Sequence, residues 1–204
     1  MNKFCRFLEI AGKFYLQALQ SFEKQPEIAY LNLITCGEVL SNYYKYDKDE
    51  LLDSETKEIL STIKTGLDNG EKISNQIKSK LRQIKKIYIK TITNLLNNYF
   101  FENSECQDKC AELKEENIEK NIAAAYDLRS KFLHTGAEFG NWISQNIFQN
   151  QELLIGVPNI KDNKLKKYIT DAPTYIGLER IMRFCLLRFM QLEGKMEIDD
   201  RLNK

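Results

Sequence analysis

The sequence predicts an all-α protein, and three observations support this. Apolar residues recur three and four positions apart through most of the chain, which is the helical period. Alternation of apolar and polar residues, which is typical of a strand, does not extend over any useful length. The 204 residues include only 9 Gly and 3 Pro, so few positions favour a break in a helix. At this length a single domain over residues 1–204 is the simplest expectation.

The first helix is expected over residues 4–22, where one apolar stripe consists of Phe4, Phe7, Ala11, Phe14, Ala18 and Phe22. Pro26 suits the first turn of a second helix, since its missing N–H would be unpaired there. That helix carries Ala29, Leu33, Cys36 and Leu40 on one face and Glu38 on another. Residues 43–61 are polar and interrupted, which indicates a loop with a short helix.

The clearest helical period runs from Glu71 to Phe101 and predicts one long central helix. Its stripe consists of Ile73, Ile77, Leu81, Ile84, Tyr88, Ile92, Leu95 and Tyr99. About thirty residues would form a rod of roughly 45 Å. The other faces carry Lys72, Lys78, Lys80, Arg82, Lys85, Lys86 and Lys90. This basic surface is either a solvated face or a surface for an RNA backbone, for which Lys78, Arg82, Lys85 and Lys86 are the candidate contacts.

The second half of the chain is less regular. An acidic connector over residues 102–117 leads into a helix expected over 112–134. Residues 136–172 contain Gly136, Gly140, Gly156 and Pro158 and are expected to form loops or short strands. A last helix follows Pro173. Its expected buried stripe is Tyr175, Leu178, Met182, Cys185 and Phe189, with Arg180, Arg183 and Arg188 outside.

Composition excludes several classes of site. The 30 basic and 29 acidic residues nearly cancel, so overall charge neither favours nor excludes a nucleic acid. Among five cysteines, Cys106 and Cys110 lie four apart, unlike a zinc knuckle, and one histidine cannot complete a Cys/His site. No metal or cofactor is therefore expected. No apolar run has the length of a membrane span, and the N-terminus lacks a signal-like apolar region. We expect a cytoplasmic protein with reduced thiols and no membrane partner.

Residues 126–136 read YDLRSKFLHTG and include His134, the only histidine, five positions after Arg129. On a helix these two residues would be about 140° apart around the axis and roughly 7.5 Å apart along it. The Thr135-Gly136 sequence predicts that the helix ends there. An arginine and a histidine suit RNA cleavage, because the 2′-OH of the substrate is the nucleophile. The imidazole moves a proton, and the guanidinium stabilises the charge that develops on phosphorus.

A single histidine has a further implication for this chemistry. Cleavage uses one base for the 2′-OH and one acid for the leaving 5′-oxygen, and each chain offers one imidazole. Two chains with motif helices facing across a two-fold axis would offer both, so a homodimer is expected. Structural interpretations remain open at this point. Arg129 could form a surface ion pair, as Asp127 and Lys131 could, and His134 could stabilise the last helical turn.

YDLRSKFLHTG resembles the signature of HEPN domains, in which an arginine precedes a histidine by four to six residues. It is most similar to the Apea-like branch, where a tyrosine-bearing helix leads into R-S-K-x-x-H-x-G. Two other segments fit the same outline. AYLNLITCGEVLSNYY (29–44) resembles an early family helix, and LERIMRFCLLRFM (178–190) is similar to the closing helix. Two positions differ from other members: Ser130 replaces the Asn, Asp or His of many active members, and His134-Thr135-Gly136 replaces a His-x-Tyr ending.

The resemblance implies a HEPN-like up-and-down helical bundle, with one long central helix and an irregular segment before the C-terminal helix. It implies a homodimeric, metal-independent endoribonuclease in which Arg129 and His134 are catalytic. Catalytic members act in toxin–antitoxin systems, phage defence and RNA processing, so an antitoxin or other defence-system partner is expected. Other members are not catalytic and bind RNA or a protein partner, and this is the alternative function.

Four residues are expected to support this pair. Glu38 would orient Arg129 if the second helix packs on the motif helix; otherwise it is a surface carboxylate. Ser130 and Tyr126 flank the arginine, and Tyr126 is either a site residue or part of the core. Lys131 is a further candidate for RNA contact.

Overall fold

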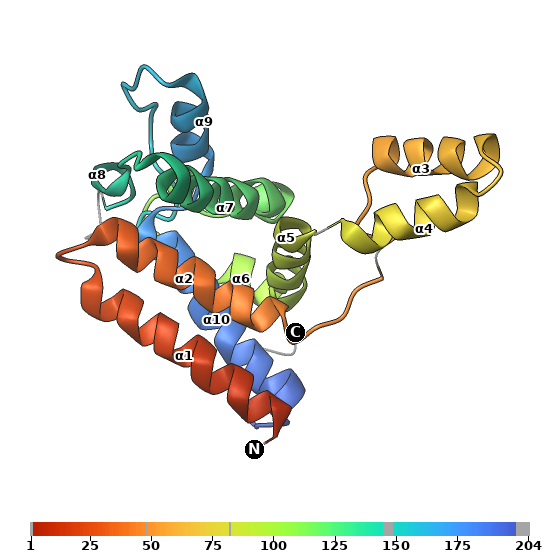
Figure 1. Ribbon diagram of the computed structural model, residues 1–204. Helices are drawn as coiled ribbons and strands as arrows, with labels where there is room; N and C mark the ends of the chain where they lie inside the picture. Colours follow the sequence, from red (N-terminus) through yellow and green to blue (C-terminus); the bar gives the residue numbers. More distant parts are fainter. Residues whose placement is uncertain (1, 48, 82, 145–148, 199–204) are drawn as a thin grey trace.

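The computed structural model describes residues 2–47, 49–81, 83–144 and 149–198, and these ranges contain helices and no strand (Figure 1). The predicted all-α class is therefore confirmed. An antiparallel bridge joins Leu153 to Pro173 outside the helices. Within the described ranges no helix combines the length and the apolar character needed to cross a membrane.

Helices α1 (Lys3–Ser21), α2 (Pro26–Ser41) and α10 (Tyr175–Gly194) pack together and contribute much of the core. Pro26 occupies the first turn of α2, as predicted. The buried stripe predicted for α10 is also confirmed, since Tyr175, Leu178, Met182, Cys185 and Phe189 are all buried. The rings of Phe4 and Phe189 lie 5.3 Å apart and join α1 to α10.

The prediction of a single long helix over residues 71–101 is wrong. The segment forms α4 (Gly70–Lys80), α5 (Ile84–Leu95) and α6 (Asn98–Glu102). Leu81 and Leu96 both adopt extended backbone conformations at the ends of α4 and α5. The apolar period continues across the breaks, but the pieces pack on different partners, which one straight rod could not do. α4 packs on α3 (Ser54–Gly66), whereas α5 packs on α2, α7 and α10.

The α3–α4 hairpin lies to one side of the other helices (Figure 1). Asp53 caps α3 by accepting a hydrogen bond from the Thr56 N–H at 2.8 Å. The short helix predicted within residues 43–61 is thus present, but it starts at Ser54 and continues to Gly66.

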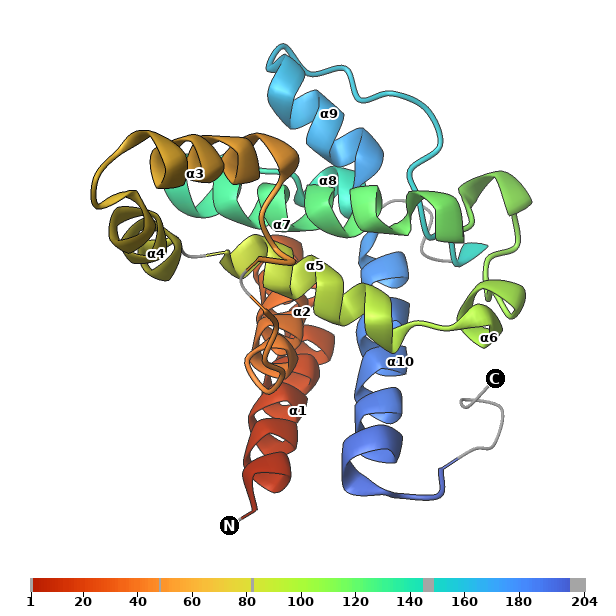
Figure 2. The same ribbon diagram turned by 90° about the vertical axis from the view of Figure 1, so that its right-hand side faces the viewer.

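Helix α7 (Ile118–Thr135) carries the motif and runs crosswise to α10 (Figure 2). It starts later than predicted, because short 3-10 turns at Lys109–Ala111 and Glu115–Asn117 occupy the connector. The segment predicted as loops or short strands contains two helices instead, α8 (Gly140–Ile143) and α9 (Asn163–Asp171). α9 packs on the outer side of α7, away from α2 (Figures 1 and 2).

The prediction that Arg180 lies on the exposed side of the last helix is also wrong, because Arg180 is buried. Its Nη1 lies 2.5 Å from Oε1 of Glu152, a residue with no exposed surface. The Glu152 carboxylate also accepts hydrogen bonds from the Leu113 N–H at 2.8 Å and the Ser104 hydroxyl at 3.2 Å. The reason for burial is that the irregular segments around Ser104 and Glu152 cover this side of α10. Burial raises the pKa of Glu152, and the nearby Arg180 charge opposes that rise.

Candidate active site

The motif helix ends as predicted. Gly136 has φ +65°, in the left-handed region, and its N–H donates to the Phe132 carbonyl at 2.8 Å. His134 therefore lies in the last turn of α7, where its side chain is exposed.

Arg129 points toward α2, where its Nη2 lies 3.1 Å from Oε2 of Glu38. The two side chains are 24% and 17% exposed, so the pair is shielded from solvent but not fully buried. The contact requires α2 and α7 to pack together, which is the condition under which Glu38 was expected to orient Arg129. The structure thus brings these two predicted site residues together.

Tyr126 joins the same cluster from the preceding turn of α7. Its hydroxyl donates to Oε1 of Glu38 at 3.0 Å, and its ring centre lies 5.6 Å from the Arg129 guanidinium carbon. The ring also packs 5.2 Å from that of Tyr88. Partial burial raises the pKa of Tyr126, and the negative charge of Glu38 adds to the rise. Tyr126 is therefore both a core contact and a partner of the carboxylate that holds the motif arginine.

His134 lines a separate hollow of about 370 Å³ at the end of α7, called here the His134 hollow. It is formed by Asp127, Ser130, Lys131, His134 and Thr135 of α7 and by Lys164 and Tyr168 of α9. Arg129 is not among these residues. Within one chain the two motif residues consequently face different surroundings, as their separation of about 140° around a helix implies.

The charges in the His134 hollow are partly compensated. Lys131 lies 2.8 Å from Asp162, and Asp127 lies 2.7 Å from Lys85. The Lys131 ammonium is the main reason that the pKa of Asp162 is lowered to about 2. Neither His134 nor Lys164 forms an ion pair with any residue that the structure describes. His134 and Lys164 are therefore the basic side chains of the hollow that have no carboxylate partner among the described residues.

The basic surface predicted on residues 71–101 is largely paired with carboxylates that the sequence pattern did not place beside it. The pairs are Lys78–Asp49 at 2.7 Å, Lys86–Asp53 at 2.7 Å, Lys90–Glu50 at 2.5 Å and Lys85–Asp127 at 2.7 Å. Arg82 lies outside the described residues. Contact of these side chains with RNA stays a prediction, but the local charge available for it is smaller than their number suggests.

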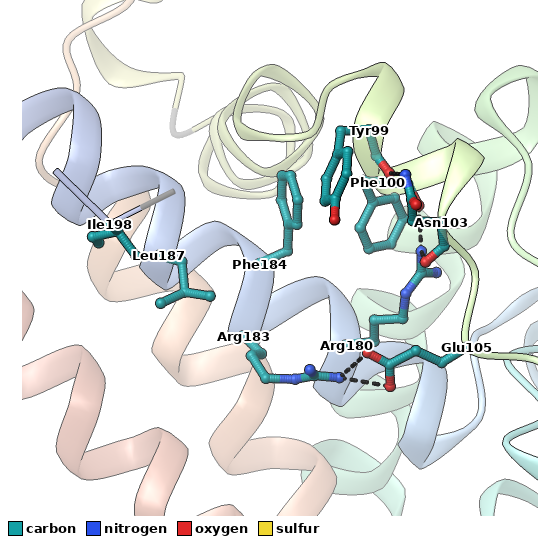
Figure 3. A pocket seen from close by; sticks show the side chains of 9 residues that line it. All are labelled: Tyr99, Phe100, Asn103, Glu105, Arg180, Arg183, Phe184, Leu187 and Ile198. Atoms are coloured by element: carbon teal, nitrogen blue, oxygen red, sulfur yellow. Dashed lines mark hydrogen bonds and ion pairs between the residues drawn. The ribbon is translucent and has the colours of Figure 1, made fainter. Parts of the chain in front are cut away.

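A different cavity of about 300 Å³ lies beside α10 and α6 and contains two arginines (Figure 3). Arg180 is engaged by Glu152 and the Asn103 carbonyl, and Arg183 lies 2.9 Å from both carboxylate oxygens of Glu105. Both cations thus already have carboxylate partners. The described residues contain no group of three or more His, Cys, Asp or Glu that could hold a metal ion.

The sequence pattern does not single out Lys164 and Tyr168, because it predicts loops or short strands over residues 136–172. A signal was present: Asp162 precedes Leu165 and Ile169, which are spaced as one face of a short capped helix.

Comparisons with protein-family models, with curated proteins and with solved structures found no match to this chain.

Proposed function

We propose that the chain is a HEPN-type, metal-independent endoribonuclease that works as a homodimer. The observation that carries the proposal is that His134, the only histidine, is exposed in the last turn of the motif helix and has no ion pair with any residue that the structure describes. The activity would belong to a defence or toxin system, in which a partner restrains it.

The proposed reaction uses the substrate's own nucleophile. An imidazole takes the proton of the 2′-OH, whose oxygen attacks phosphorus while the bond from phosphorus to the 5′-oxygen breaks. A second imidazole, protonated beforehand, gives its proton to the leaving 5′-oxygen. The products are a 2′,3′-cyclic phosphate and a free 5′-OH. Arg129 stabilises the charge on the non-bridging oxygens.

A second copy of the chain supplies the second imidazole in this proposal. Arg129 and His134 face different surroundings within one protomer, which favours a site completed across a dimer over one inside a single chain. Glu38 engages one nitrogen of Arg129, and a guanidinium has five N–H donors, so this contact still leaves donors for a phosphate.

A non-catalytic module that binds RNA or a protein partner is the second candidate. The observation that favours it is the same ion pair, since Arg129 is already neutralised by Glu38 rather than directed at the His134 hollow. Ser130, in place of the Asn, Asp or His of many active members, points the same way.

Cleavage of RNA by purified protein separates the two candidates. His134→Ala should lower the cleavage rate by roughly 10²–10⁴-fold, the usual contribution of general acid–base catalysis. Leu133→Ala is the matched control, because Leu133 is exposed beside His134 but does not line the hollow. EDTA should leave the rate unchanged, and end analysis should find the cyclic phosphate and the 5′-OH. An equal rate for His134→Ala and Leu133→Ala would favour the binding module.

A further inference from the structure

Helix α9 forms the second wall of the His134 hollow, and its own sequence explains why it is helical. The Asp162 carboxylate caps the helix by accepting from the Lys164 N–H at 2.9 Å and the Leu165 N–H at 3.0 Å. Leu165 and Ile169, one turn apart, are buried in the hydrophobic core, and α9 packs on α7. The opposite side of the short helix faces solvent.

Both ends of α9 are joined to α7 by ion pairs. At the start of α9, Asp162 pairs with Lys131 at 2.8 Å. At its end, Asp171 pairs with Lys120 at 2.9 Å, and its carbonyl accepts from the Asn121 side chain at 2.7 Å. The later residue of α7 pairs with the earlier residue of α9, so the helices run antiparallel. This arrangement fixes which side chains of α9 face His134.

The two side chains that α9 contributes to the hollow are Lys164 and Tyr168, four residues apart on one face. Lys164 is exposed, and its ammonium lies 5.8 Å from the centre of the Tyr168 ring. Tyr168 is half-buried, with part of its ring against the core. The hollow therefore combines an uncompensated cation, an aromatic ring and the single histidine.

We propose that α9 is the substrate-binding wall of this site: Lys164 binds a phosphate of single-stranded RNA, and the Tyr168 ring packs against a neighbouring base. The inference rests on the proposed function, because it takes RNA as the ligand. A flexible ammonium binds phosphate as a point charge, and an aromatic ring stacks on a base whatever its identity. Unpaired bases are accessible only in single strands and loops, which sets the substrate class.

The test measures binding separately from cleavage. A fluorescein-labelled, single-stranded 2′-O-methyl RNA of mixed sequence has no free 2′-OH and is not cut, so its anisotropy reports affinity alone. Tyr168→Ala should weaken binding about fivefold or more, while Tyr168→Phe, which keeps the ring, should bind like the original protein. Lys164→Gln should weaken binding and make the plot of log affinity against log salt shallower by about 0.7.

Lys167→Gln is the matched control, because it removes the same charge from the same helix. Lys167 is exposed, lies on the face of α9 opposite Leu165 and Ile169, and does not line the hollow. It should bind RNA like the original protein. Circular dichroism confirms that each variant keeps its helical content.

The outcomes distinguish this inference from the proposed function. If the protein cleaves RNA but the Lys164→Gln, Tyr168→Ala and Lys167→Gln variants all bind RNA equally well, the role of α9 is overturned. The proposed nuclease activity would then still be supported. Selective loss of binding in the first two variants, without cleavage by any form, would support α9 and overturn the nuclease. Absence of RNA binding by the original protein would overturn the inference outright.

Discussion

Replacing Arg180 by Met removes the cation that compensates a carboxylate with no exposed surface. Glu152 would then keep its hydrogen bonds to Leu113 and Ser104 but lose its only ion pair among the described residues. Breaking a buried pair from one side costs about 3–5 kcal/mol of unfolding free energy. Two carbonyls, of Phe100 and Asn103, also lose a donor, and unsatisfied buried acceptors account for about 1–3 kcal/mol of such a loss.

The cost of Arg180→Met should depend on pH, and its sign follows from the raised pKa of Glu152. Without Arg180 this pKa rises further, so the folded variant holds a proton that the unfolded chain releases above its ordinary pKa of 4.5. The free energy of unfolding therefore falls as pH increases between the two pKa values, by about 1.4 kcal/mol for each unit between them. The unfolding free energy of the original protein falls less over the same range, because Arg180 opposes the rise in the pKa of Glu152. The difference between the two proteins should be larger at pH 8 than at pH 5.

Urea denaturation followed by far-ultraviolet circular dichroism at the two pH values measures this difference. Arg183→Met is the matched control: Arg183 is on the same helix, its side chain is 41% exposed, and those of its partners Glu105 and Glu179 are 50% and 14% exposed. Ion pairs of an exposed cation contribute about 1 kcal/mol or less each, so this variant should lose less than Arg180→Met. A loss from Arg180→Met that is no larger than the control, or that is identical at both pH values, would refute the reasoning.

Four other substitutions test the candidate site and the packing of the helices around it. Glu38→Gln keeps an acceptor for the Tyr126 hydroxyl but loses the charge that holds Arg129. If the chain is the nuclease proposed above, kcat for RNA should fall roughly ten- to hundredfold with KM unchanged, and a change confined to KM would contradict a positioning role. Gly136→Ala places a side chain at φ +65° and should lower the unfolding free energy by roughly 1–2 kcal/mol in urea titrations; an unchanged value would show that the left-handed turn is not required. Gly177→Ala would put a Cβ 2.3 Å from the Glu152 carbonyl oxygen and should cost about 1–3 kcal/mol or more. Gly12→Ala, which meets open space in a helix, should instead stabilise by about 0.5–1 kcal/mol, and equal effects of the two alanines would contradict the packing argument.

The helices that pack on the core by one apolar face were predictable from the sequence. Pro26 marks the start of α2, and the stripe from Tyr175 to Phe189 marks the buried face of α10. The breaks at Leu81 and Leu96 were not, because neither position has a Gly or Pro and the period continues through both. Period shows that a segment has an apolar face, but it does not show which partner covers that face.

Part of the candidate site was likewise predictable from the sequence, and part was not. The motif itself indicated that α7 would end at Gly136, and the contact between Arg129 and Glu38 followed once α2 packed on α7. The burial of Arg180 could not be predicted, since an arginine between apolar positions normally marks an exposed face. Its partner Glu152 lies in an irregular segment without a period that would locate it in the fold.

The α3–α4 hairpin has a consequence for how the molecule opens. The two helices pack mainly on each other, Leu60 is the only buried residue of α3, and ion pairs such as Lys78–Asp49 and Lys86–Asp53 lie at the surface. Regions with few buried contacts exchange their amide hydrogens through local opening, without global unfolding. The hairpin should therefore exchange as its own cooperative unit and faster than α2 and α10. Its opening would leave α7, and with it both motif residues, held in the folded bundle.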